Sequence, residues 1–183
     1  KKIKSLLTHH NPYDILSCDN TKYDMVFTTN RTMAKELKDA GIEANCIPHG
    51  IDIDFFRYNA HYTEEKVVNM VVNRFESKKG VLPVAKVCKE LGYKFVAVGR
   101  ISNPEYFEQC IKEGMEFHEG ISWEELRDIY YKSAIHVCNS IDGFESGTLP
   151  QLEAMSCGVP VLTRNVGQVP DFDNGRNCVI NKS

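Results

Sequence analysis

The sequence lacks the patterns that mark several common classes of protein. It contains no Gly-x-Gly-x-x-Gly and no Gly-x-x-x-x-Gly-Lys, so a redox Rossmann domain and a P-loop nucleotidase lose their main support. No run approaches about 18 apolar residues and no apolar signal-peptide core is seen, so we expect no transmembrane segment and a cytoplasmic location. The net charge is only −3 with both signs interspersed, which gives no support for nucleic-acid binding. These absences favour a globular domain with small or local partners.

Cysteine and histidine do not occur at metal-ligand spacing. The seven cysteines include no Cys-x-x-Cys pair and mostly lie within apolar runs, which predicts reduced thiols. The six histidines never form an i, i+4 pair, so we expect structural or surface roles and no metal site. His49 is of interest because it lies at the expected interdomain cleft.

A window from Phe144 to Pro160 carries the strongest chemical signal. Two glutamates, Glu145 and Glu153, bracket a turn that leads from a strand into helical spacing of apolar residues. The first N–H groups of a helix lack intrahelical partners and carry the positive end of its dipole, so this turn should favour a phosphate. Carboxylates on both sides accept hydrogen bonds from sugar hydroxyls, which indicates a nucleotide sugar. The residues of the turn are Ser146, Gly147, Thr148 and Leu149.

Each glutamate also has an ordinary interpretation, as a helix-capping acid or part of a solvated helix face. Glu153 is followed by an apolar Cys-Gly-Val-Pro-Val run that should be buried, and a buried carboxylate needs a donor. This context favours a ligand-binding role.

Strands and helices alternate along most of the chain, which predicts an α/β fold with a Rossmann-like parallel sheet covered by helices on both faces. Ser122 and Glu125 form an expected capping box, and Val81, Val84, Cys88 and Leu91 an expected buried stripe. Strands are expected at 24–28, 45–47, 67–72, 94–98, 115–118, 134–138 and 159–162, and helices at 32–40, 80–91, 104–113, 122–132 and 149–157.

Polar residues follow several of these strands. Ligands of open α/β sheets bind at the carboxyl ends of the strands, so these residues should gather at one edge. They are Arg74, Gly99 and Arg100, Glu119 and Gly120, and 142–147.

The glutamate window, followed by Ala-Met-x-x-Gly-x-Pro-Val, resembles the donor-site signature of glycosyltransferase family 4, retaining enzymes of the GT-B fold. Three other segments, Cys46–Phe56, Asn73–Gly80 and Val159–Phe172, are similar to family elements in the same order. Asn73–Gly80 matches an Arg-(four residues)-Lys-Gly element. Four ordered pieces are a stronger signal than one motif.

The resemblance implies roles for individual residues. Glu145 would contact hydroxyls of the donor sugar, Glu153 the ribose hydroxyls, and Arg74 and Lys79 the diphosphate. The loop departs from the family, which places glycines on either side of a phenylalanine after the first glutamate; here Phe144 precedes Glu145. The role of Arg100 stays open, since the family often has a small or apolar residue there.

The expected organisation is a tail of an acceptor-binding domain and a linker at 1–51, followed by a donor-binding domain at 52–183. The expected activity is metal-independent sugar transfer with retention, from a nucleotide-diphosphate sugar as donor substrate and with no cofactor. Partners would be that nucleotide sugar and a glycan, lipid or protein acceptor, with peripheral membrane contact left to the rest of the acceptor-binding domain. The chain alone should be inactive, because transfer needs both halves of the fold. A non-catalytic nucleotide-sugar-binding module and a sugar-nucleotide epimerase of the same fold stay open as alternatives.

Overall fold

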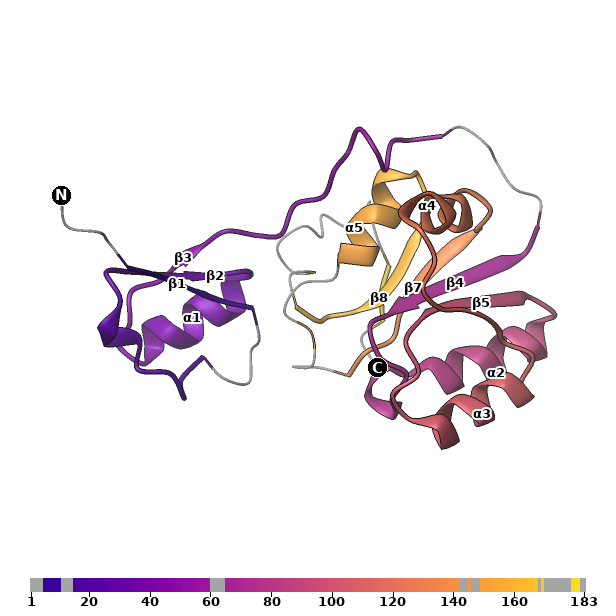
Figure 1. Cartoon of the computed structure of the whole chain (residues 1–183), viewed down its shortest axis with the longest axis horizontal. Helices are drawn as coiled ribbons and strands as arrows, with labels where there is room; N and C mark the ends of the chain where they lie inside the picture. Colours follow the sequence, from indigo (N-terminus) through magenta and orange to yellow (C-terminus); the bar gives the residue numbers. More distant parts are fainter. Residues whose placement is uncertain are drawn as a thin grey trace.

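The computed structural model describes residues 5–10, 15–59, 65–141, 145, 149–167, 169 and 179–181. These residues form two parallel sheets, which Figure 1 shows joined by an extended segment. The first has three strands in the order β1-β2-β3, and the second has six in the order β6-β5-β4-β7-β8-β9. The α/β fold with Rossmann-like parallel sheets is thereby confirmed.

The smaller sheet consists of β1 (Leu6–His9), β2 (Met25–Thr28) and β3 (Asn45–Cys46). Helix α1 (Arg31–Asp39) begins where the Asn30 side chain accepts a hydrogen bond from the Met33 N–H at 2.9 Å. Its Met33 and Leu37 side chains pack on β2 and close a small apolar core. The sequence did not predict β1, whose short strand is followed directly by polar residues.

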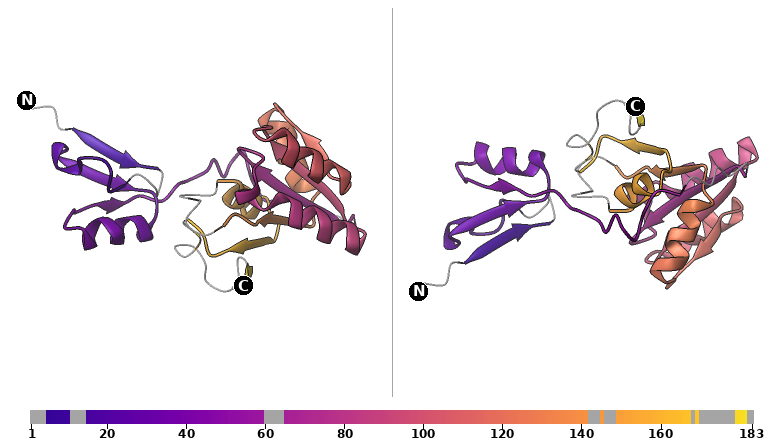
Figure 2. Two further views of the ribbon diagram at one scale, coloured as in Figure 1. Left: turned by 90° about the horizontal axis from the view of Figure 1, so that it is seen from below. Right: turned by 90° about the horizontal axis from the view of Figure 1, so that it is seen from above.

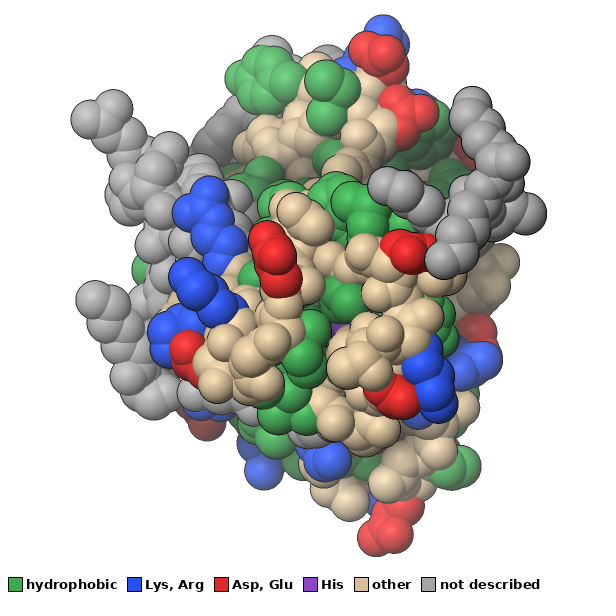
Figure 3. Space-filling view, turned by 90° about the vertical axis from the view of Figure 1, so that its left-hand side faces the viewer, with side chains coloured by type: hydrophobic (Ala, Val, Ile, Leu, Met, Phe, Trp, Pro, Cys, Tyr) green, Lys and Arg blue, Asp and Glu red, His purple; other side chains and the backbone are tan. Residues whose placement is uncertain are grey.

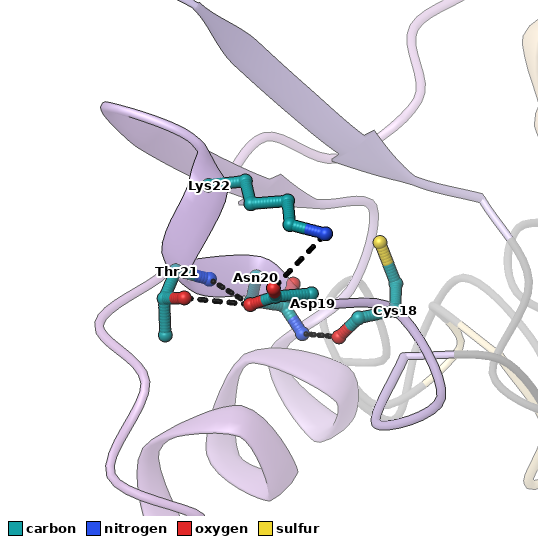
Figure 4. A network of polar contacts seen from close by, with 5 residues as sticks. All are labelled: Cys18, Asp19, Asn20, Thr21 and Lys22. Atoms are coloured by element: carbon teal, nitrogen blue, oxygen red, sulfur yellow. Dashed lines mark hydrogen bonds and ion pairs between the residues drawn. The ribbon is translucent and has the colours of Figure 1, made fainter.

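A short 3₁₀ turn (Asn20–Lys22) precedes β2 and is held by side chains (Figure 4). Asp19 accepts hydrogen bonds from the N–H of Thr21 at 3.3 Å and its hydroxyl at 2.6 Å, and pairs with Lys22 at 3.2 Å. Buried Asn20 donates to the carbonyl of Ile15 at 2.8 Å. The turn is therefore anchored to the small core beside it.

The larger sheet contains β4 (Val67–Val72), β5 (Lys94–Gly99), β6 (Glu116–His118), β7 (Ile135–Cys138), β8 (Val161–Arg164) and β9 (Val179–Asn181). Strands β5 and β6 follow β4 toward one edge of the sheet, whereas β8 and β9 follow β7 toward the opposite edge. The order of the strands therefore reverses between β4 and β7. Such a switch point is where open α/β sheets bind ligands.

Helices cover both faces of the larger sheet (Figures 1 and 2). Helices α2 (Val81–Leu91) and α3 (Pro104–Lys112) pack on one face, and α4 (Trp123–Tyr131) and α5 (Leu149–Ser156) on the other. Strand side chains alternate between the two layers. In β4, Val68, Met70 and Val72 join the α2–α3 core, whereas Val71 packs with α4 and α5.

The structure confirms the capping box of α4, in which Ser122 accepts from the Glu125 N–H at 3.2 Å and its own N–H donates to the Glu125 carboxylate at 2.7 Å. The expected stripe of α2 was partly wrong. Val81, Ala85 and Cys88 are buried, whereas Leu91 is 59% exposed. Leu91 lies about 60° round the helix from Cys88 and is the last residue of α2.

Strand β8 begins two residues later than the sequence predicted. The Val159 N–H still bonds to the carbonyl of Ala154 at 2.9 Å, so Val159 belongs to the end of α5. Strand β9 was not predicted.

The connection between the sheets packs against the larger one. Phe56 is buried in the α4–α5 core, edge-on to Trp123 and Tyr130. The Tyr131 hydroxyl donates to the carbonyl of Arg57 at 2.9 Å. The Asp52 carboxylate accepts from the N–H groups of Asp54 and Phe55, so the segment 52–55 forms a turn.

The surface over the smaller sheet carries both signs of charge with apolar side chains between them (Figure 3). In the part of the chain that the structure describes, no helix combines the length and apolar character needed to cross a membrane. The described cysteines are free thiols.

Candidate functional site

A cavity of about 260 Å³ opens at the carboxyl ends of β4 and β7, at the switch point of the sheet. Strand β4 supplies its floor, the loop after β4 and the loop after β7 supply its charged side chains, and the start of α5 closes it. The lining residues are Met70, Val71, Val72, Asn73, Lys79, His136, Cys138, Ser140, Glu145, Leu149, Pro150 and Gln151.

The loop after β4 is fixed by Phe75. This ring is fully buried and packs edge-on against Phe107 and Phe117. Its N–H donates to the carbonyl of Arg100 at 3.0 Å, and its own carbonyl accepts from the Ser102 hydroxyl at 2.9 Å. A 3₁₀ turn (Ser77–Lys79) then directs Lys79 inward, where it is only 5% exposed.

Gly80 allows this turn to approach the loop after β7. Its φ of +66° lies in the left-handed region, and a Cβ built there would stand 2.5 Å from the carbonyl oxygen of Asn139. The Asn139 side-chain amide donates to the Gly80 carbonyl at 3.1 Å, and the Ile141 N–H donates to the carbonyl of Lys78 at 3.0 Å. The two loops that carry the charged groups are thereby joined by one side-chain and one backbone hydrogen bond.

Lys79, Glu145 and Ser140 meet at one atom. The Lys79 ammonium forms an ion pair with Glu145 Oε1, and the Ser140 hydroxyl donates to the same oxygen at 2.6 Å. The side chains of both charged partners are largely buried, so the interaction is weakly screened by water. The cavity therefore presents a cation and an anion side by side.

A second, more open hollow adjoins this cavity. It runs over the ends of β5 and β6 to the start of α4, and it shares Val72 and Asn73 with the first cavity. Gly99, Arg100, Gly120 and Trp123 lie along it. Gly99 is required by packing, because a Cβ there would stand 2.2 Å from the carbonyl oxygen of Val72. The two hollows therefore meet at Val72 and Asn73.

Glu153 lies inside the protein, only 5% exposed, where its carboxylate accepts a hydrogen bond from the Tyr130 hydroxyl at 2.8 Å. Burial raises the pKa of Glu153, and the Tyr130 hydrogen bond partly counteracts this. The pKa of the Tyr130 hydroxyl is raised by burial and by the Glu153 charge. The structure supplies a protein donor for this carboxylate, a tyrosine of α4, where the sequence analysis favoured a ligand.

Other buried polar groups lie on the same face of the sheet. The His136 ring donates from Nδ1 to the Asn69 side-chain oxygen at 2.6 Å, and burial lowers the pKa of His136 to about 3. The imidazole is therefore neutral at physiological pH. The Gln151 amide donates to the Thr163 hydroxyl at 2.6 Å, which joins α5 to β8.

The residues expected at the site fall into several groups, and Glu153 is among the lining residues of neither hollow. Lys79, Glu145 and Leu149 line the first cavity, and Gly99, Arg100 and Gly120 line the second hollow. Arg74 is exposed on the loop after β4, and Glu119 accepts from the Ile101 N–H at 3.2 Å. Ser146, Gly147 and Thr148 lie outside the described residues.

Sequence reasoning missed Ser140, His136, Asn73 and Gln151 among the lining residues. Ser140 and Asn73 are polar residues directly beyond strand ends, so the rule that selected Arg74 could have found them. His136 and Gln151 stand within a strand and a helix and gave no such signal.

Residues 52–174 match the family model of the glycosyl transferases group 1. A curated relative, an uncharacterised 41.2 kDa protein of the cps region of Klebsiella pneumoniae, is 26% identical over 93% of this chain and 55% of its own length. The chain therefore spans about half the length of that protein.

Solved structures share the fold at low sequence identity. Anabaena Alr3699/HepE, solved in complex with UDP and glucose, has a TM-score of 0.75 and 16% identity over 96% of this chain and 57% of its own. TarM has a TM-score of 0.82 and 15% identity over 99% of this chain and 41% of its own. These similarities show the arrangement of one half of a GT-B structure.

Proposed function

Because the chain belongs to the glycosyl transferases group 1 family, we propose that it binds the nucleotide-sugar donor of a retaining, family 4-like glycosyltransferase of the GT-B fold. The observation that carries this proposal is the convergence of Lys79, Ser140 and Glu145 in a cavity at the switch point of the sheet. A cation for a diphosphate and a carboxylate for sugar hydroxyls stand together there.

The diphosphate would bind beside Lys79. An ammonium that is 5% exposed acts in a poorly solvated place, where its attraction for an anion is stronger than at the surface. The exposed Arg74 guanidinium would approach from the same loop, and the start of α5 would add backbone N–H groups. Together they offset the charge on the leaving diphosphate as the sugar bond breaks, which is electrostatic stabilisation of the transition state.

The sugar and the nucleoside would lie on opposite sides of the diphosphate. Glu145 would accept from sugar hydroxyls in the first cavity, and the base would lie in the hollow at Gly99, Arg100 and Gly120. Glu153 would accept from the ribose hydroxyls. The shared residues Val72 and Asn73 give a ligand of this shape a continuous path.

Transfer would proceed with retention of the anomeric configuration and without a metal ion, because Lys79, Arg74 and the helix start supply the positive charge. The acceptor, a glycan, lipid or protein, would bind across from this half of the fold. The chain alone would bind donor but not transfer it.

Binding is tested on this chain by calorimetry with UDP, GDP and ADP and with UDP-glucose, GDP-mannose and ADP-glucose. We expect one base to be preferred. Glu153→Gln should weaken that nucleotide by about 1–3 kcal/mol with the fold intact, since the amide oxygen still accepts from Tyr130. Glu124→Gln, an exposed change on α4, serves as the control. Failure to bind any of the three diphosphates would contradict the proposal.

Transfer is tested on a two-domain protein that includes this chain. Sugar transfer in EDTA at nearly the normal rate, with the donor configuration kept, is the expected result. Loss of activity on chelation and its return with magnesium or manganese would overturn the metal-independent mechanism. Binding without turnover over a broad acceptor panel would instead favour a binding module, and release of a sugar inverted at one ring carbon an epimerase.

A further inference from the structure

We propose that Ser140 is a positioning residue: its hydroxyl holds Glu145 Oε1 in place when Lys79 is drawn from Glu145 to the diphosphate of the donor. The inference rests on the proposed function and adds a residue and a sequence of events to it. Ser140 then determines how well the site distinguishes a nucleotide sugar from the corresponding nucleoside diphosphate.

The geometry places both donors on one oxygen. Lys79 and Ser140 both contact Oε1 of Glu145. The second carboxylate oxygen is thereby the one that can be offered to a hydroxyl of the ligand. A donor that stays on the first oxygen restricts where the carboxylate can lie.

Ser140 is suited to hold a carboxylate still. Its side chain is 1% exposed, and its neighbours on both sides are tied to the loop that carries Lys79. Asn139 donates to the Gly80 carbonyl at 3.1 Å and the Ile141 N–H donates to the Lys78 carbonyl at 3.0 Å. The hydroxyl is therefore fixed relative to the whole site.

The two donors differ in what a ligand does to them. The Lys79 ammonium carries a full charge and would be attracted to a diphosphate that bears more negative charge than Glu145 does. The Ser140 hydroxyl is neutral and has no comparable attraction. When the ammonium moves, the hydroxyl bond at 2.6 Å remains and keeps Glu145 directed at the sugar.

Lys79 and Ser140 should therefore affect the binding of different parts of the ligand, and this difference can be measured. A nucleoside diphosphate uses Lys79 and makes no use of the orientation of Glu145, whereas a nucleotide sugar uses both. Loss of the Ser140 hydroxyl should therefore weaken binding of the nucleotide sugar and leave binding of the nucleoside diphosphate nearly unchanged. A general disturbance of the fold would weaken both ligands alike.

The test compares the dissociation constants of UDP and UDP-glucose, or of the GDP or ADP pair if that base is preferred, for the wild-type chain and Ser140→Ala. We expect UDP-glucose affinity to fall by about tenfold and UDP affinity to change by no more than about twofold. Ser133→Ala is the matched control, because Ser133 is also buried and donates at 2.7 Å, but to the Ile129 carbonyl on α4. It should leave the ratio of the two constants unchanged.

A double-mutant cycle with Glu145→Gln identifies the route. If Ser140 acts through Glu145, then Ser140→Ala should change the ratio by less than about twofold in the Glu145→Gln background. Equal effects in both backgrounds, equal losses for both ligands, or no change in the ratio would each overturn the assignment. Should Ser140→Ala not fold, Ser140→Cys, which keeps nearly the same shape with a weak donor, must lose the preference in the same way.

The two hypotheses fail differently. A wild-type chain that binds none of the diphosphates contradicts the proposed function and the Ser140 assignment with it. A wild-type chain that binds the nucleotide sugar, with a ratio that Ser140→Ala leaves unchanged, contradicts only the Ser140 assignment.

Discussion

His136 donates from Nδ1 to the side-chain oxygen of Asn69 at 2.6 Å, which joins β7 to β4 inside the protein at the point where the order of the strands reverses. Neither side chain contacts solvent to more than 1% of its surface. The bond lies beneath the candidate donor cavity, which His136 helps to line. Its effect on stability should depend on pH.

Burial lowers the pKa of His136 to about 3, whereas in the unfolded chain it should be near 6.5. Between these values the unfolded state binds more protons, so stability falls as the pH falls. From pH 7.5 to 5.5 this residue should cost about 1.4 kcal/mol of the free energy of unfolding. In urea unfolding, the His136→Gln variant should not show this fall in the free energy of unfolding. The His118→Gln variant, which changes a partly exposed ring on β6, should still show it. An identical pH dependence in His136→Gln and the wild type would contradict the prediction.

Tyr130→Phe should destabilise the chain by about 1–3 kcal/mol, because it leaves the Glu153 carboxylate buried without its donor. Burial already raises the Glu153 pKa, and loss of the hydrogen bond should raise it further. A raised carboxyl pKa means that stability is lost as the pH rises from the unfolded value through the folded one. The cost of Tyr130→Phe should therefore be larger at pH 7 than at pH 5.

Tyr106→Phe provides the control for that experiment. Tyr106 is also buried, but its hydroxyl oxygen accepts from the N–H of Leu82 at 2.9 Å, and no carboxylate of the described residues hydrogen-bonds to it. Its cost in thermal or urea unfolding should be the same at both pH values. A cost of Tyr130→Phe that does not change with pH would show that Glu153 is not ionised beside it.

Arg74→Ala and Lys79→Ala should weaken nucleoside diphosphates much more than the corresponding nucleosides, because only the former carry the charge that these residues would meet. Calorimetry with UDP and uridine, or the pair of the preferred base, measures the difference. Lys86→Ala, an exposed change on α2, should affect neither ligand. Equal losses for both ligands would exclude the phosphate assignment.

Gly80→Ala should cost more stability than Gly92→Ala. Both glycines have a positive φ, 66° at Gly80 and 68° at Gly92, so both changes incur the left-handed strain of about 1–2 kcal/mol. Only at Gly80 would the new Cβ also meet a neighbour, the Asn139 carbonyl oxygen at 2.5 Å, whereas nothing lies within 4 Å at Gly92. Thermal melting measures the difference, and Gly80→Ala alone should weaken diphosphate binding. Equal melting temperatures for the two variants would contradict the proposed approach of the loops.

The parts of the fold that the sequence predicted are those with strong local signals. Strand β4 is an apolar run interrupted only by the buried Asn69, and α4 begins at a capping box, so both were expected close to their observed bounds. The strands β1 and β9 were missed because their few residues form strands only through pairing with β2 and β8. Pairing partners distant in sequence leave no local periodicity.

The candidate site was predicted by residue type but not by contact. Lys79 and Glu145 were expected to serve the same ligand, yet nothing in the sequence indicated that they pair with each other across 66 positions. The partnership of Glu153 with Tyr130 was hidden for the same reason, since it needs α4 and α5 to lie on the same face. Contacts between elements follow from topology, which the sequence specifies only through the whole fold.

The burial of Phe56 determines where a shorter fragment that contains the larger sheet can begin. Its ring lies against Trp123 and Tyr130 although its segment follows the smaller sheet in sequence. A recombinant fragment that starts at residue 65 would contain all six strands of the larger sheet but lack Phe56. The apolar surface at Trp123 and Tyr130 would then be exposed to water, and the fragment should aggregate. A fragment that starts at Gly50 includes Phe56 and keeps this surface covered. The practical place to cut lies between Cys46 and Gly50, before the first residue that the larger sheet needs for solubility.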